Sequence, residues 1–400
     1  MGAEHAREAH AAKAEGAVVI AAPFAVEASF LAARDAAAIE AEWRDLAADA
    51  VEPNPFYAPA LLLPALETFA DEKVRLALVR DERGRMIALA PVAPARGYSR
   101  LPVAYVETWM HPHCFFAAPL IRRGRERDAL AALFKLVEGE GAFFRLRHLD
   151  ADGVLHAAAL DAARAAGRLA APSARYQRAM LKGGYESGAY LEAALRGKKR
   201  KELRRLRARL QGQGDFAFES LARAGDVDQW TDEFLALERA GWKGKAESAL
   251  ASSPGEAGFF RRALKRAHAD GMLDFHRLRL GSRTIAAIVN FIENGAGYSF
   301  KIAYDEEFAR YSPGVLLEID MMRALEAREG LAFMDSCASR DHPMINSLWR
   351  ERRTIEAINI SGLRRRSKLL FRLLTALERI GEKARAKAAD RVEENAVDDL

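Results

Sequence analysis

The sequence contains little cysteine and no long apolar segment. Only Cys114 and Cys337 occur among its 400 residues, far apart in the chain, which argues against a disulfide framework and a cysteine-rich metal site. Each is expected to be a small buried residue, with a nucleophile as the alternative. No stretch reaches about 18 uninterrupted apolar residues, and residues 1–16 carry charges where a signal peptide would be apolar. We therefore expect a cytoplasmic protein.

Motifs of several large enzyme classes are absent as well. The sequence has no P-loop, no dinucleotide-binding fingerprint and no Gly-x-Ser-x-Gly elbow. The run "HPHC" (111–114) has a crowded spacing and no second cluster of ligands elsewhere in the chain. We interpret it as a loop and expect no bound metal.

The composition supplies enough apolar material for two folded domains. Hydrophobic residues make up 50% of the chain and charged residues 29%, an ordinary balance for a globular protein. A chain of 400 residues is long for one domain and comfortable for two. The net charge of +5 is distributed unevenly: residues 196–209 are densely basic, residues 363–387 predict a basic amphipathic helix, and residues 390–400 form an acidic tail.

Turn residues divide the second half of the chain into clear elements. Gly281-Ser282 and Asn294-Gly295 are suited to tight hairpin turns between strand-like runs. They predict a three-stranded antiparallel meander, followed by a helix, a buried strand, a short helix and a last strand. The expected ranges, in that order, are 273–280, 283–292 and 296–304 for the meander, then 314–329, 331–337, 342–352 and 354–360.

The first half repeats this order more faintly. The expected strands are 74–80, 85–92, 103–109, 143–149 and 175–181, and the expected helices are 126–139 and 154–166. The repetition predicts two related α/β domains joined near the Gly-rich residues 182–190. Before the second meander the sequence predicts a basic helix at 188–212, a strand at 215–221 and helices at 226–240 and 255–269, which would cover the sheet.

One helix start in the second half is suited to an anion. In "YDEEFARYSPGVLL" (304–317), Ser312 is placed to cap the helix, Pro313 takes its first position and Gly314 leaves the backbone bare. The amides of the first turn and the positive end of the helix dipole would attract a phosphate. Arg310 would add a charge-assisted contact. The alternative is an ordinary capped helix.

Several segments carry a family likeness. They are "RGKKRKELRRLRARL" (196–210), "FLALERAGWKGK" (234–245) and "FKIAYDEEFARYSPGVLL" (300–317), with "PNPFYAPALL" (53–62) and "HPHCFFAAPLI" (111–121) in the first half. They resemble the duplicated branch of the GNAT acyltransferases that includes the CelD/BcsL-like acetyltransferases of cellulose and exopolysaccharide loci. That branch is related to the FemAB peptidyltransferases.

The resemblance implies an α/β (α+β) fold of two tandem GNAT-like domains, each a mixed, mostly antiparallel sheet flanked by helices. The implied division is 1–22 as a flexible N-terminal segment, 23–182 as a GNAT-like domain without a donor site, 183–362 as the acyltransferase domain, and 363–400 as the basic helix and acidic tail. The implied activity is N-acyl transfer, N-acetyl transfer first of all, from acetyl-CoA or another acyl-CoA to an amine acceptor in cell-envelope or exopolysaccharide metabolism.

The resemblance also implies a donor site where the strands 296–304 and 331–337 splay apart. The implied contacts to the donor are the backbone amide of Ile302, which would polarise the thioester carbonyl, and Arg310, Tyr311, Ser312, Gly314 and Val315 around the CoA diphosphate.

Candidate groups for proton transfer lie beyond the second of these strands. They are Asp335, Asp341 and His342, because an imidazole titrates near neutral pH and carboxylates accept protons. A packed loop histidine is the alternative for His342, and a turn-capping carboxylate is the alternative for Asp335.

Candidate contacts to the acceptor lie where Gly241 breaks a predicted helix. Glu238, Trp242 and Lys243 would offer a stacking ring flanked by charges, although Trp242 could equally anchor the core. Lys301 and Tyr304, which flank the end of the third strand, are further candidates.

Three alternatives to an acyl-CoA-dependent enzyme stay open. One is a FemAB-like transferase that takes its donor from aminoacyl-tRNA. Another is a non-catalytic binding protein with this fold. The third is a membrane-surface partner of a polysaccharide machine, held through residues 363–387. The basic run 196–209 would contact tRNA, the 3′-phosphate of CoA or an anionic membrane, and a simple solvated face is its alternative.

Overall fold

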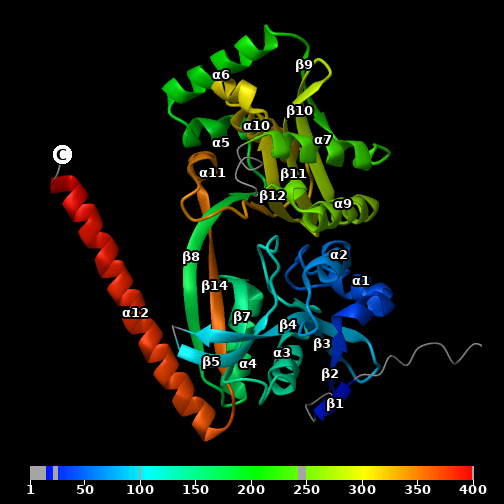
Figure 1. The fold of residues 1–400 in the computed structure, drawn as a ribbon, viewed down its shortest axis with the longest axis vertical. Helices are drawn as coiled ribbons and strands as arrows, with labels where there is room; N and C mark the ends of the chain where they lie inside the picture. The colour runs from blue at the N-terminus through cyan, green and yellow to red at the C-terminus, as the bar shows by residue number, and fades with distance from the viewer. Residues whose placement is uncertain (1–14, 21–25, 99–100, 242–248, 399–400) are drawn as a thin grey trace, which may run out of the picture.

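The computed structural model describes residues 15–20, 26–98, 101–241 and 249–398. These residues form one mixed sheet of 14 strands with helices packed along it (Figure 1). The strands follow the order β1-β2-β3-β4-β5-β7-β14-β8-β13-β12-β11-β10-β9, and β6 pairs with β4. The predicted fold class, a mixed and mostly antiparallel sheet flanked by helices, is confirmed.

The first half of the chain ends with β8. Its strands are β1 (Glu15–Ile20), β2 (Val26–Ala32), β3 (Arg75–Arg80), β4 (Met86–Tyr98), β5 (Leu101–Thr108), β6 (Leu120–Ile121), β7 (Phe143–Asp150) and β8 (Ala170–Lys182). Its helices are η1 (Ala33–Ile39), α1 (Glu40–Ala48), α2 (Pro59–Phe69), α3 (Glu126–Leu136) and α4 (Val154–Ala165). The elements before β3 were not predicted, and β1, which pairs with β2, lies inside the N-terminal segment that was expected to be flexible.

The second half runs from residue 183 to the end of the chain. Its strands are β9 (Phe216–Ser220), β10 (Leu273–Leu280), β11 (Arg283–Glu293), β12 (Ala296–Tyr304), β13 (Phe333–Asp335) and β14 (Glu351–Ser361). Its helices are α5 (Ser187–Ala194), α6 (Gly197–Gln211), α7 (Val227–Ala240), η2 (Leu250–Ser252), α9 (Pro254–Ala269), η3 (Glu306–Tyr311), α10 (Pro313–Glu326), α11 (Pro343–Leu348) and α12 (Arg365–Asp398).

The predicted meander of the second half is confirmed, together with its turns. β10, β11 and β12 pair antiparallel in sequence order. Asn294 and Gly295 both have positive φ angles, 47° and 81°. A two-residue hairpin turn of type I′ requires positive φ at both central positions, and asparagine and glycine tolerate it best.

The basic run predicted as one helix over 188–212 forms two helices, α5 and α6. Leu195 and Arg196 between them are extended, with ψ angles of 131° and 146°. Gly197, a poor helix former, begins α6. The guanidinium of Arg200 turns back and donates to the carbonyl oxygen of Glu192 at 2.8 Å, which satisfies a carbonyl near the end of α5.

The two halves exchange their last strands. In each half one strand runs parallel to the third strand of a meander: β7 beside β5, and β13 beside β12. The last strand of each half then pairs with the other half, because β14 lies antiparallel to β7 and β8 lies antiparallel to β13. β8 and β14 also pair with each other (Figure 1). The sheet is therefore continuous across residue 182, near which the sequence predicted a linker.

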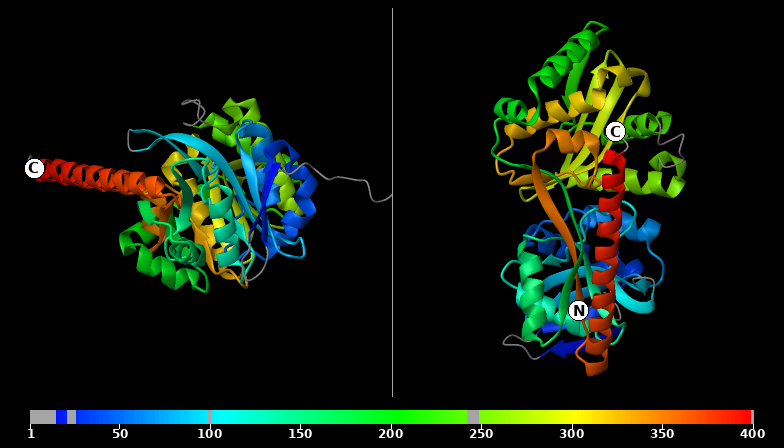
Figure 2. Two further views of the ribbon diagram at one scale, coloured as in Figure 1. Left: turned by 90° about the horizontal axis from the view of Figure 1, so that it is seen from below. Right: turned by 90° about the vertical axis from the view of Figure 1, so that its left-hand side faces the viewer.

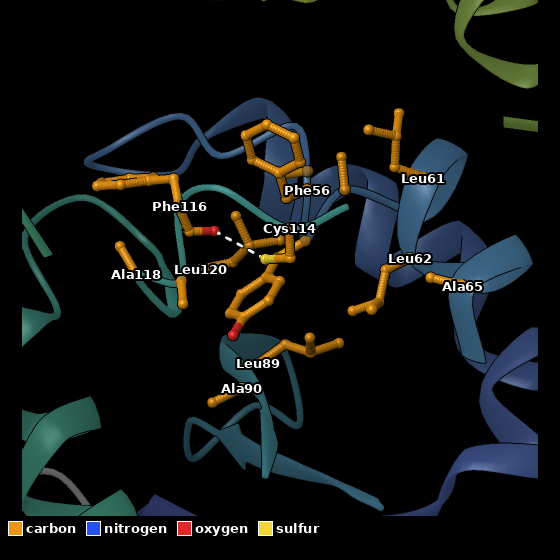
Figure 3. Packing of buried hydrophobic residues seen from close by; sticks show 14 of the residues in the cluster. Phe56, Leu61, Leu62, Ala65, Leu89, Ala90, Cys114, Phe116, Ala118 and Leu120 are labelled. Atoms are coloured by element: carbon orange, nitrogen blue, oxygen red, sulfur yellow. Dashed lines mark hydrogen bonds between the residues drawn. The ribbon is translucent and has the colours of Figure 1, made fainter. Parts of the chain in front are cut away.

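An apolar core joins the halves. The ring of Phe56 lies 5.7 Å from that of Tyr298 and 6.2 Å from that of Phe300 in β12, measured between centroids. Cys114 is buried in the same core, where its thiol donates to the carbonyl oxygen of Phe116 at 3.3 Å (Figure 3). Burial raises the pKa of this thiol to about 12. Cys114 is thus the small buried residue that was expected, and its high pKa disfavours a nucleophilic thiolate.

Candidate functional site

The third strand of the second meander separates from its parallel neighbour partway along its length. β12 pairs with β13 only at Ala296, Gly297 and Tyr298. Just beyond, the register between β11 and β12 shifts so that Phe300 is an extra residue in β12. A bulge of this kind bends and twists a strand. In the described structure, no strand pairs with the rest of β12 on the side where β13 lies, and an opening begins there.

Backbone amides of β12 face this opening. The N–H of Asp305 donates toward β11, to the carbonyl oxygen of Ile285 at 2.9 Å. Since N–H groups alternate in direction along a strand, those of Ile302 and Tyr304 point away from β11. The amide of Ile302 therefore has the direction that its predicted role requires.

The helix α10 begins at the same opening. Pro313 takes its first position, as predicted, and the amide of Leu316 bonds back to the carbonyl oxygen of Ser312 at 3.1 Å. Ser312 is the capping residue, but its side chain makes no capping hydrogen bond and its φ angle is 54°. Among the described residues, the amides of Gly314 and Val315 have no acceptor. The first turn also has no acidic side chain, so two backbone donors are available to an anion.

A cavity of about 310 Å³ lies between the ends of α7 and β12 and the starts of α10 and α11. Its lining residues are Leu237, Glu238, Gly241, Ile302, Ala303, Tyr304, Gly314, His342 and Met344. Five of these were predicted from sequence: Glu238, Ile302, Tyr304, Gly314 and His342. The apolar lining residues Leu237 and Met344 were not predicted as site residues. What could have indicated them in the sequence is their position close to Glu238 and His342.

Glu238 is the carboxylate on the cavity wall. Its side chain comes from the end of α7 and the residue is 3% exposed. The Oε2 atom accepts a hydrogen bond from the backbone N–H of Leu250 at 2.9 Å. This contact fixes the carboxylate at the edge of a largely apolar cavity, where it is suited to accept a proton from an amine.

His342 lines the opposite side of the cavity and begins α11. Its Nδ1 accepts from the backbone N–H of Ile345 at 3.4 Å. A neutral imidazole with Nδ1 as acceptor carries its proton on Nε2. The ring is therefore arranged as a hydrogen-bond donor.

Asp335 lies outside the cavity, in a buried network of charges. Its Oδ2 accepts from Arg178 at 2.6 Å and from Arg353 at 2.8 Å, and the residue is 0% exposed. Burial alone would raise the pKa of Asp335, but the two guanidinium groups outweigh it and hold the pKa below its usual value. A carboxylate held ionised in this way is a poor proton acceptor. These contacts indicate a structural role in place of the predicted catalytic one.

Asp341 and Lys301 were also predicted on the acceptor side, and neither lines the cavity. Asp341 is exposed, with the guanidinium of Arg340 4.0 Å away. The ammonium of Lys301 lies 5.7 Å from the centroid of the Phe300 ring. Trp242 and Lys243 lie outside the described residues.

On the donor side, Arg310 and Tyr311 contact one another beside the helix start. The guanidinium of Arg310 lies 4.9 Å from the centroid of the Tyr311 ring. The hydroxyl of Tyr311 accepts from the side-chain amide of Gln213 at 2.8 Å, which ties this turn to the end of α6. Arg310 is exposed and within the same turn as the available amides, whereas the Tyr311 side chain is buried.

A larger cavity, of about 500 Å³, lies at the junction of the halves. None of its lining residues is a candidate site residue of the sequence analysis. Its arginines already have partners: Arg44 pairs with Asp270 at 2.6 Å and Arg328 pairs with Asp274 at 3.2 Å. We therefore take the smaller cavity beside β12 as the candidate site.

Comparisons with known proteins agree with this geometry. Residues 197–342 match the family model of the acetyltransferase (GNAT) domain, a range that includes the meander, the start of α10 and His342. This part of the second half is therefore similar to a GNAT acetyltransferase domain, and the resemblance predicted from sequence is confirmed at this level. The comparisons do not single out the CelD/BcsL-like branch. No curated protein sequence is similar enough to match the chain.

Solved structures share the fold over both halves. The C-terminal domain of an Agrobacterium fabrum protein described as a lysylphosphatidylglycerol synthetase has a TM-score of 0.53 at 13% identity, covering 81% of this chain and 91% of that one. FemX has a TM-score of 0.52 at 11% identity, covering 84% of this chain and 98% of that one. At such low identity the likeness establishes the fold alone.

Proposed function

We propose that the protein is an N-acyltransferase that moves an acyl group from an acyl-CoA, with acetyl-CoA as the first candidate, to a primary amine. One observation carries this proposal: Ile302 of β12, Gly314 at the start of α10 and Glu238 at the end of α7 all line one cavity. An acceptor from cell-envelope or exopolysaccharide metabolism is the part of the proposal that rests on sequence resemblance.

The donor would bind along the opening beside β12. Its diphosphate lies at the start of α10, where the amides of Gly314 and Val315 and the helix dipole favour negative charge. The thioester carbonyl then accepts a hydrogen bond from the N–H of Ile302. This donor stabilises the negative charge that develops on the carbonyl oxygen during attack.

Two side chains would move the protons. Glu238 takes a proton from the ammonium form of the acceptor, because only a neutral amine is a nucleophile. The nitrogen then bonds to the acyl carbon and the carbon–sulfur bond breaks. The Nε2–H of His342 protonates the departing thiolate. The second proton that the nitrogen must lose to become an amide replaces the one that His342 gave up, and Glu238 releases the first proton to solvent.

Titration calorimetry of acetyl-CoA into the full chain tests the donor site. A Cβ at Gly314 would lie 3.6 Å from the Tyr304 ring and 3.7 Å from the Cδ1 of Ile302, which are ordinary contacts. Gly314→Ala should therefore bind as the wild type does, whereas Gly314→Trp fills the opening and should abolish the heat. Absence of heat with folded wild-type protein would reject the acyl-CoA donor.

Glu238→Gln separates binding from catalysis. The variant should retain acetyl-CoA affinity and lose acyl transfer by about a hundredfold or more, the usual contribution of a general base. Equal losses of affinity and turnover would instead indicate that Glu238 only supports the fold of the cavity wall.

An aminoacyl-tRNA donor is the second candidate, favoured by the surface of α6. Its exposed cations are Lys198, Lys199, Lys201, Arg204, Arg205 and Arg209. Binding of tRNA that weakens steeply with salt, together with no heat from acetyl-CoA, would favour this donor over acyl-CoA.

A further inference from the structure

The exposed apolar side chains of the molecule are concentrated on and just before one helix. α12 has 34 residues, about 51 Å at 1.5 Å per residue, and projects from the body of the molecule (Figure 2). In the described structure the exposed large hydrophobic residues are Val154, Leu363, Leu369, Leu370, Leu373, Leu377 and Ile380. Single exposed apolar residues are normal, but a cluster of this kind marks an interaction surface.

The opposite face of α12 is docked on the sheet. Phe371 and Leu374 are 3% and 1% exposed and pack with Tyr98 and Phe143. The rings of Phe143 and Phe371 lie 6.2 Å apart between centroids. The hydroxyl of Tyr98 also donates to the carboxylate of Glu378. Because these contacts fix the rotation of the helix, Leu369, Leu373 and Leu377 face outward in the folded protein.

The outward residues form two parallel strips. Leu369, Leu373 and Leu377 recur every four residues and Ile380 follows three later, a spacing that makes one continuous apolar strip on a helix. Cations with helical spacings of three, four and seven residues form a second strip beside it: Arg365, Lys368, Arg372 and Arg379. Within the described residues, none of these four has a carboxylate partner.

We propose that this face of α12 binds the surface of an anionic lipid membrane. The apolar strip would enter the boundary between headgroups and acyl chains, and the cationic strip would contact the negatively charged headgroups. The contact is along the surface of the bilayer. Among the described residues, no helix combines the length and apolarity that a membrane crossing requires.

Charge favours lipid over a second copy of the chain. Leu370, Leu373, Leu377 and Ile380 also fit a heptad spacing, which could pair two such helices. Pairing would, however, bring two cationic strips together, and Glu378, the one acid among residues 365–381, is already engaged by Tyr98. An anionic lipid surface neutralises the same charges. This proposal does not depend on the activity of the cavity beside β12.

Vesicle flotation with the full chain tests the proposal. The probes are vesicles of phosphatidylcholine alone and of phosphatidylcholine mixed with phosphatidylglycerol. We expect binding to the mixed vesicles, weakened by salt, and at least about tenfold weaker binding to phosphatidylcholine alone. Arg372→Gln with Arg379→Gln should weaken binding by about fivefold per cation, and Leu373→Gln with Leu377→Gln by about tenfold or more.

Val154→Gln is the matched control, because Val154 is 53% exposed and lies in a different helix, α4. It should bind vesicles as the wild type does. The proposal is overturned if the α12 variants float as well as the wild type, or if the wild type does not float. It is also overturned if light scattering shows a wild-type dimer that Leu373→Gln dissociates while vesicle binding is absent, since the strip would then join two copies of the chain.

Discussion

The helices α3 and α10 occupy the same place in the two halves and begin in different ways. α10 begins with Pro313 and Gly314 and has no acid in its first turn. α3 begins with Glu126 and has Asp128 in the same turn, and the carboxylate of Glu126 accepts from the backbone N–H of Gly124 at 2.9 Å. Acidic side chains at a helix start satisfy its positive end themselves. The start of α10 therefore leaves its backbone donors to an external anion, whereas the start of α3 is satisfied by its own acidic side chains.

The openings beside the two parallel strand pairs differ as well. Beside β12 there is a cavity, whereas the loop after β5 packs against the second half. In that loop His111 stacks on Phe69 with centroids 5.3 Å apart, and His113 contacts the carboxylate of Glu256 at 3.1 Å. Burial lowers the pKa of His111 to about 3, so this ring is a neutral packing element. The opening beside β12 is therefore a cavity, whereas the corresponding loop of the first half is part of the interface between the halves.

The largest expected effect concerns the charges that join the halves. Arg178 of β8, Asp335 of β13 and Arg353 of β14 meet where the last strands are exchanged. Asp335→Asn leaves two buried guanidinium groups without their shared carboxylate and should lower the free energy of unfolding by about 3–5 kcal/mol. Because the pKa of Asp335 is lowered on folding, the wild-type contribution is present at neutral pH and is lost as pH falls through that pKa.

Denaturant unfolding near neutral pH measures this loss, and Asp341→Asn is the control, since its side chain is 93% exposed. The control should change stability little. If Asp335→Asn were equally harmless, backbone hydrogen bonds and apolar packing would hold the exchanged strands without a contribution from these charges.

A smaller effect tests the difference between the buried faces of α3 and α10. The buried residues of α3 are all apolar, whereas α10 buries Glu318, and burial raises the pKa of that carboxyl from 4.5 to about 8. Between these values the folded state holds a proton that the unfolded state releases, so stability falls as pH rises through this window. Glu318→Gln should remove that slope.

Melting curves below the unfolded pKa of 4.5 and above the raised pKa of about 8 check this outcome. The variant should gain stability over the wild type on the alkaline side and little on the acid side. Glu326→Gln, at an exposed position of the same helix, should show no such pH dependence. A gain that is the same at every pH would mean that Glu318 is not the titrating group.

The elements predicted best from the sequence are those set by neighbouring residues. Asn294-Gly295 fixes a hairpin through its own backbone preferences, and Pro313 fixes a helix start. The exchange of β8 and β14 was not predicted, because a strand sequence does not say which partner it pairs with. The charged partners of Asp335 were not predicted for the same reason: Arg178 lies 157 positions away in the chain. Glu238 and His342 were named from the sequence as separate candidates, while the apolar residues of the cavity wall have sequence features shared by any core residue.

The prediction with the smallest expected effect tests the difference between the starts of α3 and α10 directly. Val315→Glu gives α10 an acid in its first turn, as Glu126 and Asp128 do in α3. An acid there complements the helix dipole, so the fold should be retained. The carboxylate competes for the same amides, and acetyl-CoA affinity should fall by about tenfold, a cost of about 1.4 kcal/mol. Calorimetry measures it, with Val315→Gln as the uncharged control. Unchanged affinity in Val315→Glu would place the diphosphate away from α10, and the contrast between the two helices would then have no bearing on which half binds the donor.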